Sequence, residues 1–206
     1  MNKDLIKIEN SSLIKSEPRN ITLKDKSKYF EYVENLNLNQ NINISTTVNG
    51  NLITSNIIPN NEFYNLFVLD GEDFAKCYFI INKKDCLKYM DKQISALFSL
   101  SNSDSLNKCL TYPCLFANKN NEYLKAGKDQ LSYFGYLTKI EISDNSIKFY
   151  FSIVSSLPQA IFNDYAQSFN LMESKGENEL DKVHWSIKNI NLVKCIRNLG
   201  FNVASY

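Results

Sequence analysis

Arginine, histidine and tryptophan are scarce in this sequence of 206 residues. The chain has one histidine, one tryptophan and only two arginines, Arg19 and Arg197. Arginine reads guanine edges and phosphates well because its donors form a rigid fork, so its scarcity argues against sequence-specific DNA recognition. A net charge of +1 points the same way, since proteins that bind nucleic acid through bulk electrostatics are clearly basic.

Glycine is also rare, and its six residues are isolated from one another. Phosphate-cradling loops need the backbone to approach the ligand at several positions, which clustered glycines allow. Gly127-Lys128 is followed by Asp129, where a P-loop would have Ser or Thr. P-loop NTPases and Rossmann oxidoreductases are therefore excluded.

The five cysteines are odd in number, and charges interrupt the first 15 residues where a secretory leader would be apolar. We therefore expect a reduced, cytoplasmic protein with free thiols. The cysteines lack the tight spacing of a zinc site, and a single imidazole leaves little equipment for nucleophilic catalysis. No apolar run approaches the roughly 18 residues of a membrane span. We expect no cofactor and no membrane contact.

Aromatic residues are plentiful instead, with 13 Phe and 12 Tyr. A chain of this length can bury about 70% of the surface that it exposes when unfolded. We expect a loose arm over residues 1–21 and one α+β domain over 22–206. A polar stretch at 99–105 is a candidate subdomain boundary.

Alternating apolar residues and turn signals predict antiparallel hairpins at about 41–58, 63–81 and 133–154. The first is marked by Asn49-Gly50, which tolerates the positive φ values of a type I′ turn. Helical periodicity predicts helices at about 26–36, 83–99, 157–171 and 190–199. In the helix predicted at 83–99, the inward face consists of Leu87, Met90, Ile94 and Leu97.

The only histidine and the only tryptophan, His184 and Trp185, are adjacent. As a helix, residues 180–188 would place His184 on the buried face and Trp185 to the side. As a strand, they would place Trp185 inside and His184 outside with Lys182 and Lys188. Val, Trp and Ile favour the strand.

The strand alternative predicts a modest basic patch that could hold phosphates or an acidic partner surface. Its members are Lys182, His184, Lys188, Lys194 and Arg197. The alternative is a solvated face, on which Lys194 and Arg197 complement the dipole of a C-terminal helix.

Asp70, Glu72 and Asp73 form an acidic cluster at a predicted turn. Three carboxylates could hold Mg²⁺ or Mn²⁺ for phosphodiester hydrolysis. An acidic turn is more often simply solvated, and the one Glu-x-Lys motif, at Glu173, lies in a polar loop rather than on a strand.

The order FGYLTKIEISDNSIKFYF and HWSIKNINLVKC resembles small proteins of bacterial mobile elements and defence islands. Frequent Asn, Lys, Ile and Tyr suggest an AT-rich genome of a bacterium or phage. We expect a non-catalytic binding or accessory protein that contacts a partner protein or a nucleic-acid backbone. The alternative is a metal-dependent hydrolase or nuclease that uses Asp70, Glu72 and Asp73.

Overall fold

The computed structural model describes residues 43–48, 51–56, 60–173 and 176–203. The arm predicted at 1–21 and the helix predicted at 26–36 lie outside these residues. Strands β1 (Asn43–Val48) and β2 (Asn51–Asn56) pair antiparallel, which corresponds to the hairpin predicted at 41–58.

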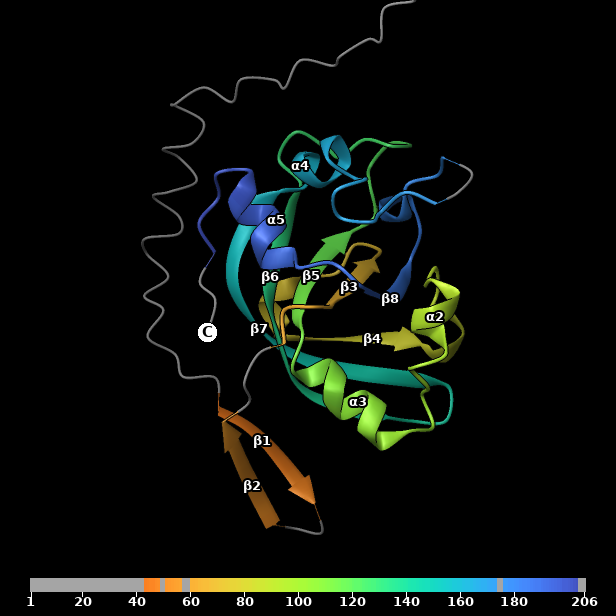
Figure 1. The fold of residues 1–206 in the computed structure, drawn as a ribbon, viewed down its shortest axis with the longest axis vertical. Helices are drawn as coiled ribbons and strands as arrows, with labels where there is room; N and C mark the ends of the chain where they lie inside the picture. Colours follow the sequence, from red (N-terminus) through yellow and green to blue (C-terminus); the bar gives the residue numbers. More distant parts are fainter. Residues whose placement is uncertain (1–42, 49–50, 57–59, 174–175, 204–206) are drawn as a thin grey trace, which may run out of the picture.

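The main element is a mixed six-stranded sheet with the order β4-β7-β6-β5-β3-β8 (Figure 1). Its strands are β3 (Tyr64–Leu69), β4 (Tyr78–Asn82), β5 (Pro113–Asn118), β6 (Leu131–Ile142), β7 (Ser146–Pro158) and β8 (His184–Lys188). Neighbouring strands are antiparallel except for β3 and β5, which are parallel. The fold class is therefore α+β, as the sequence predicts.

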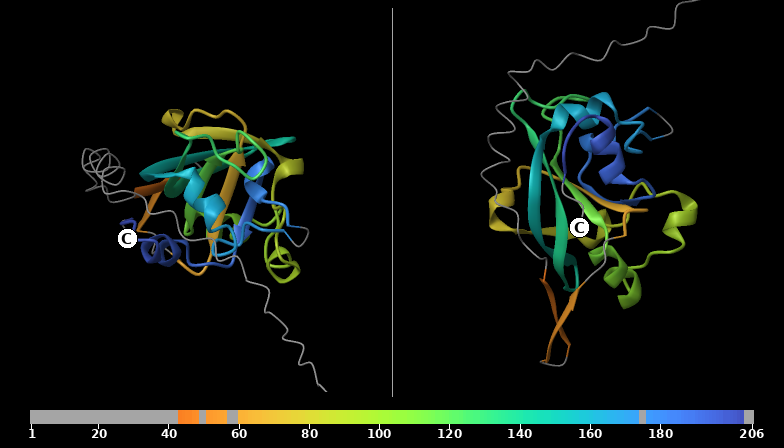
Figure 2. Two further views of the ribbon diagram at one scale, coloured as in Figure 1. Left: turned by 90° about the horizontal axis from the view of Figure 1, so that it is seen from above. Right: turned by 60° about the vertical axis from the view of Figure 1, so that its left-hand side comes forward.

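The sheet curls into a half-barrel, and side chains from distant strands therefore meet inside it. The rings of Phe67 on β3 and Phe79 on β4 have centroids 5.0 Å apart, and so do those of Phe149 on β7 and Trp185 on β8. Three strands separate each of these pairs in the sheet order. The curl is visible when the molecule is seen from above (Figure 2).

Both faces of the sheet are covered, so its central strands are buried on both sides. The concave aromatic core includes Ile94 on α2 (Lys92–Ser95) and Phe98, which follows that helix. It also includes Cys109 and Leu110 on α3 (Ser103–Leu110). Helices α4 (Gln159–Asp164) and α5 (Leu192–Asn198) contribute to the core on the convex face (Figure 1). Among the described residues, no helix has the length and hydrophobicity to cross a membrane.

The predicted hairpin at 63–81 is wrong, because β3 lies between β5 and β8 whereas β4 pairs with β7. The turn between them contains a 3-10 helix, η1 (Phe74–Lys76), whose start is capped by Asp73. The turn therefore redirects the chain to the far edge of the sheet. The hairpin predicted at 133–154 corresponds to β6 and β7.

The long helix predicted at 83–99 is also wrong. That segment contains only η2 (Lys83–Asp85) and the short α2. Leu87 and Tyr89 have φ values of 54° and 51°, in the left-handed region that a right-handed helix cannot include. The helices predicted at 157–171 and 190–199 shorten to α4 and α5.

Candidate functional site

Residues 184–188 form strand β8, but both of its faces are buried. Trp185 faces the concave core, as the strand alternative predicts, and its ring stacks on Phe67 at 5.7 Å. The prediction that His184 and Lys188 face solvent is wrong, since both are almost fully buried. The reason is η3 (Glu179–Asp181), which is buried together with the second face of β8.

A single carboxylate joins the two buried basic side chains of β8. Nε2 of His184 lies 3.0 Å from Oε2 of Glu179, and Nζ of Lys188 donates to the other oxygen of the same carboxylate. Lys188 also donates to the Tyr89 carbonyl at 2.9 Å. Burial lowers the pKa of Lys188, while the carboxylate of Glu179 opposes that shift. Glu179, His184 and Lys188 therefore form a buried cluster that connects β8, η3 and the 86–91 segment.

Tyr89 separates this cluster from solvent. Its ring meets the His184 ring edge-on at 4.8 Å, and Nζ of Lys182 lies 4.9 Å from the Tyr89 ring centroid. Lys182 is itself paired with Glu173 at 2.6 Å. His184, Lys188 and Glu179 are therefore shielded from solvent in this conformation.

The five residues of the predicted basic patch are therefore divided between interior and surface. His184 and Lys188 are internal, Lys182 is half-buried, and Lys194 and Arg197 are exposed on α5. Arg197 donates to the Val203 carbonyl at 3.0 Å, which fixes the last described residue against the helix.

The three acidic residues at 70–73 make separate local contacts. Asp70 pairs with Lys119 at 3.5 Å on the surface, and Asp73 accepts from the backbone N–H of Ala75. The backbone N–H of Glu72 donates to the side chain of Asn118. In the described part of the chain, no group of three His, Cys, Asp or Glu side chains is arranged to hold a metal ion.

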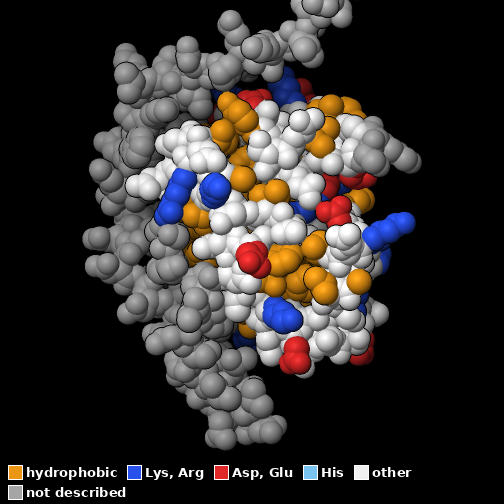
Figure 3. Space-filling model, viewed as in Figure 1, with side chains coloured by type: hydrophobic (Ala, Val, Ile, Leu, Met, Phe, Trp, Pro, Cys, Tyr) orange, Lys and Arg blue, Asp and Glu red, His pale blue; other side chains and the backbone are white. Residues whose placement is uncertain are grey.

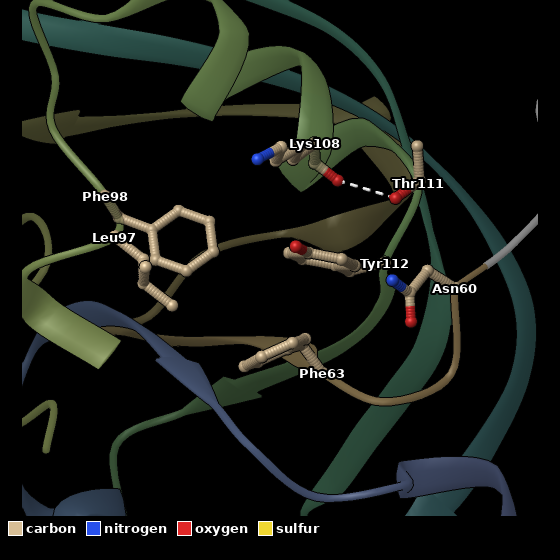
Figure 4. A pocket seen from close by; sticks show the side chains of 7 residues that line it. All are labelled: Asn60, Phe63, Leu97, Phe98, Lys108, Thr111 and Tyr112. Carbon is tan, nitrogen blue, oxygen red and sulfur yellow. Dashed lines mark hydrogen bonds between the residues drawn. The ribbon is translucent and has the colours of Figure 1, made fainter. Parts of the chain in front are cut away.

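An aromatic cleft of about 270 Å³ opens between the start of β3, the 95–100 segment and α3. It is lined by Asn60, Phe63, Leu97, Phe98, Lys108, Thr111 and Tyr112. Figure 4 shows the rings of Phe63, Phe98 and Tyr112 around a common space. Their centroids are 5.4 to 6.2 Å apart, so the three rings form a continuous apolar wall.

The rim of the cleft is exposed and apolar. Leu97 is 61% exposed although it is a large hydrophobic residue. Figure 3 shows hydrophobic side chains gathered on this part of the surface with charged side chains around them. Among the described residues that line the cleft, Lys108 is the only charged one.

The local sequence positions this rim. Asn102 caps α3 by accepting from the backbone N–H groups of Asp104 and Ser105. The hydroxyl of Ser105 donates to the carbonyl of Leu97 at 3.3 Å, which ties the rim to the helix. Lys108 and Thr111 are held at the end of the same helix by a 2.7 Å bond from the Thr111 hydroxyl to the Lys108 carbonyl (Figure 4).

Sequence reasoning missed this cleft, because its aromatic residues are distant in the chain and each is typical of a core. The helical pattern over 83–99 places Leu97 on an inward face, whereas the structure exposes it. The available signal was the polar stretch at 99–105, which turns the chain sharply after Phe98.

Comparison with known proteins gives no match: no family model, curated protein or solved structure is significantly similar to this chain.

Proposed function

We propose that this protein acts by contact, and that a partner protein inserts an apolar side chain into the aromatic cleft. The observation that carries the proposal is the exposed Leu97 beside the nearly buried rings of Phe98 and Tyr112. Binding energy in protein interfaces is concentrated in a few anchor residues that fill such pockets. Exposed apolar patches on otherwise polar surfaces mark interaction sites.

The size and chemistry of the cleft favour an anchor residue over a substrate. Its volume of about 270 Å³ is at the small end of the roughly 300 to 1,000 Å³ typical of small-molecule sites and has room for a single side chain. The described residues of its lining include no carboxylate, imidazole or thiol that could take part in acid-base or nucleophilic chemistry. Binding, rather than catalysis, is the function that these residues support.

Lys108 gives the expected partner a second property. An ammonium group at the edge of an apolar pocket attracts a carboxylate and fixes the orientation of the partner. We therefore expect an aromatic or aliphatic anchor with an acidic neighbour. A nucleic-acid backbone would instead need several cations in a row, and the described lining of the cleft has one.

The proposed setting of this contact is the cytoplasm of a bacterium, or of a cell infected by a phage. All five cysteines are free thiols, which supports a reducing, cytoplasmic compartment. Residue usage and the resemblance to small proteins of mobile elements and defence islands support a bacterial or phage setting. The partner would then be another component of such a system.

Selection of random dodecapeptides on the full-length protein tests the proposal. We expect enriched peptides to share an apolar anchor beside Asp or Glu, and to lose at least tenfold in affinity for Leu97→Asp. Tyr123→Asp is the matched control, since Tyr123 is also exposed but lies in the loop between β5 and β6. Equal loss in both variants, or binding that resists Leu97→Asp, would contradict the proposal.

A further inference from the structure

We propose that β4 is a second docking site, at which an extended acidic segment of a partner protein adds to the sheet as a further strand. β4 is the terminal strand of the sheet and pairs on one side only, with β7, among the described residues (Figure 1). This site is separate from the aromatic cleft, so the inference does not depend on the function proposed above.

The hydrogen-bond phase of β4 shows which backbone groups face away from the sheet. The N–H of Phe151 donates to the Cys77 carbonyl at 3.1 Å, and the N–H of Lys83 donates to the Asn145 carbonyl at 3.0 Å. In an antiparallel ladder, every second residue bonds to the same neighbour. Residues 77, 79, 81 and 83 therefore face β7, whereas Tyr78, Ile80 and Asn82 direct their backbone groups outward.

These outward groups suit an added strand. The Asn82 carbonyl accepts a weak bond from the Cys86 thiol at 3.3 Å, which leaves Tyr78 and Ile80 as the centre of the open edge. Binding by strand addition uses main-chain bonds for affinity and alternate side chains for specificity. β4 contains neither proline nor glycine, so nothing in its sequence interrupts a new ladder.

The side chains along the edge are exposed and partly apolar. Ile80 is 55% exposed and Tyr78 is 39% exposed, while Phe79 and Ile81 between them are buried. Lys148 on β7 lies beside Ile80 and places its ammonium 4.1 Å from the Tyr78 ring centroid. An added strand would therefore meet an apolar residue flanked by an ordered cation.

Charge decides between the two strands that could occupy this edge. Lys76 precedes β4, Lys83 and Lys84 follow it, and Lys76 and Lys84 are exposed. Two-fold pairing with a second copy through Ile80 would bring Lys76 in η1 near Lys84 in η2 of that copy, just beyond the ends of the paired strands, and like charges repel each other there. An added strand with acidic ends would instead bring carboxylates near these lysines, which lie at the two ends of β4.

Selection of random nonapeptides on full-length Leu97→Asp protein tests the inference, because this substitution disables the cleft. We expect enriched peptides with alternating apolar residues and acidic ends. Their affinity should fall at least tenfold for Ile80→Pro, which removes one outward N–H at a position where an edge strand tolerates proline. Ile80→Thr keeps that N–H and should retain affinity within about threefold.

Two further measurements keep the result independent of any folding defect in Ile80→Pro. N-methylation of alternate peptide residues should abolish binding in one phase and leave it intact in the other, since only one set of N–H groups faces β4. Enrichment of basic peptides, no enrichment, equal effects of both methylation phases, or self-association of the protein that Ile80→Pro abolishes would each overturn the inference.

Discussion

His184 and Glu179 are in direct contact inside the protein: Nε2 of the imidazole lies 3.0 Å from Oε2 of the carboxylate, and both side chains are almost fully excluded from solvent. The other ring nitrogen, Nδ1, lies 2.8 Å from the Lys182 carbonyl. Both nitrogens thus face acceptor oxygens, and the ring can donate to both only when doubly protonated. With Lys188 on the same carboxylate, Glu179 is the centre of a buried ionic cluster.

Substitution Glu179→Gln should destabilise the protein by about 3 to 5 kcal/mol, since it leaves the buried ammonium of Lys188 without its carboxylate. Urea denaturation at neutral pH measures the change. Glu122→Gln is the control, because Glu122 forms an exposed pair with Lys125, and should cost less than about 1 kcal/mol. Similar losses in both variants would mean that the cluster contributes no special stability.

The sequence predicts the position of one of the two adjacent residues, Trp185, and not that of the other, His184. The residue types Val, Trp and Ile favour a strand over a helix at 180–188, and the alternation of a strand then places Trp185 inside, where its indole packs in the concave core. The position of His184 depends on a segment that covers the second face of the strand, and alternation carries no information about such a cover. The same limit explains β3 and β4, whose partners lie far away in the sequence.

The buried thiols should make stability fall at alkaline pH. Burial raises the pKa of Cys86 and of Cys109 to about 12, and that of Cys114 well above its ordinary value. The unfolded chain releases these protons near its thiol pKa of about 8.5, whereas the folded chain keeps them. The stabilisation is therefore complete below about pH 8.5 and is lost progressively as pH rises toward 12.

Urea unfolding between pH 8 and pH 11 measures this slope. Cys109→Ala should make it shallower, and Cys77→Ser should leave it unchanged because Cys77 is exposed. The lowered pKa of Lys188 makes stability rise with pH in this range, which opposes the effect of the thiols. Three thiols contribute to the decrease in stability and one amine opposes it. A stability that stays constant up to pH 11 would contradict the burial of these thiols.

Asn120 is the centre of a buried amide network. The substitution Asn120→Asp should reduce the stability of the protein more than Asn120→Ala does. Its Nδ2 donates to Oδ1 of Asp181 at 2.7 Å and to Asn163 at 2.9 Å. Asn120→Asp places a second carboxylate against Asp181 and should cost about 3 to 5 kcal/mol at pH 7. Asn120→Ala should cost about 1 to 3 kcal/mol.

The pH dependence separates these two effects. Acidification should restore part of the lost stability in Asn120→Asp relative to wild type, because protonation removes the repulsion and supplies a donor. Asn120→Ala should show no such recovery. Thermal unfolding at pH 7 and pH 5 provides the comparison, and identical behaviour of the two variants would remove the basis for a contact with Asp181.

Gly135→Ala should disrupt the β6–β7 pairing. A Cβ at this position would lie 2.1 Å from the carbonyl oxygen of Ser152, and the register of the two strands shifts between Phe134 and Gly135. Because a backbone atom cannot move aside, we expect a loss of about 3 kcal/mol or more. Gly71→Ala is the control. A Cβ at Gly71 would have open space around it, so only the strained φ value of 67° should reduce stability, by about 1 kcal/mol. Differential scanning calorimetry should rank Gly135→Ala as the more damaging; the reverse order would count against the close strand approach.

An NMR titration of the ¹⁵N-labelled protein with N-acetyltryptophanamide measures whether the aromatic cleft accepts an apolar side chain. Saturable shifts should be concentrated at the amides of Phe63, Leu97, Phe98 and Tyr112, should weaken at least threefold in Leu97→Asp, and should be absent with N-acetylasparaginamide. Shifts scattered over the surface, or no shifts up to the solubility limit, would mean that the cleft does not bind an apolar side chain.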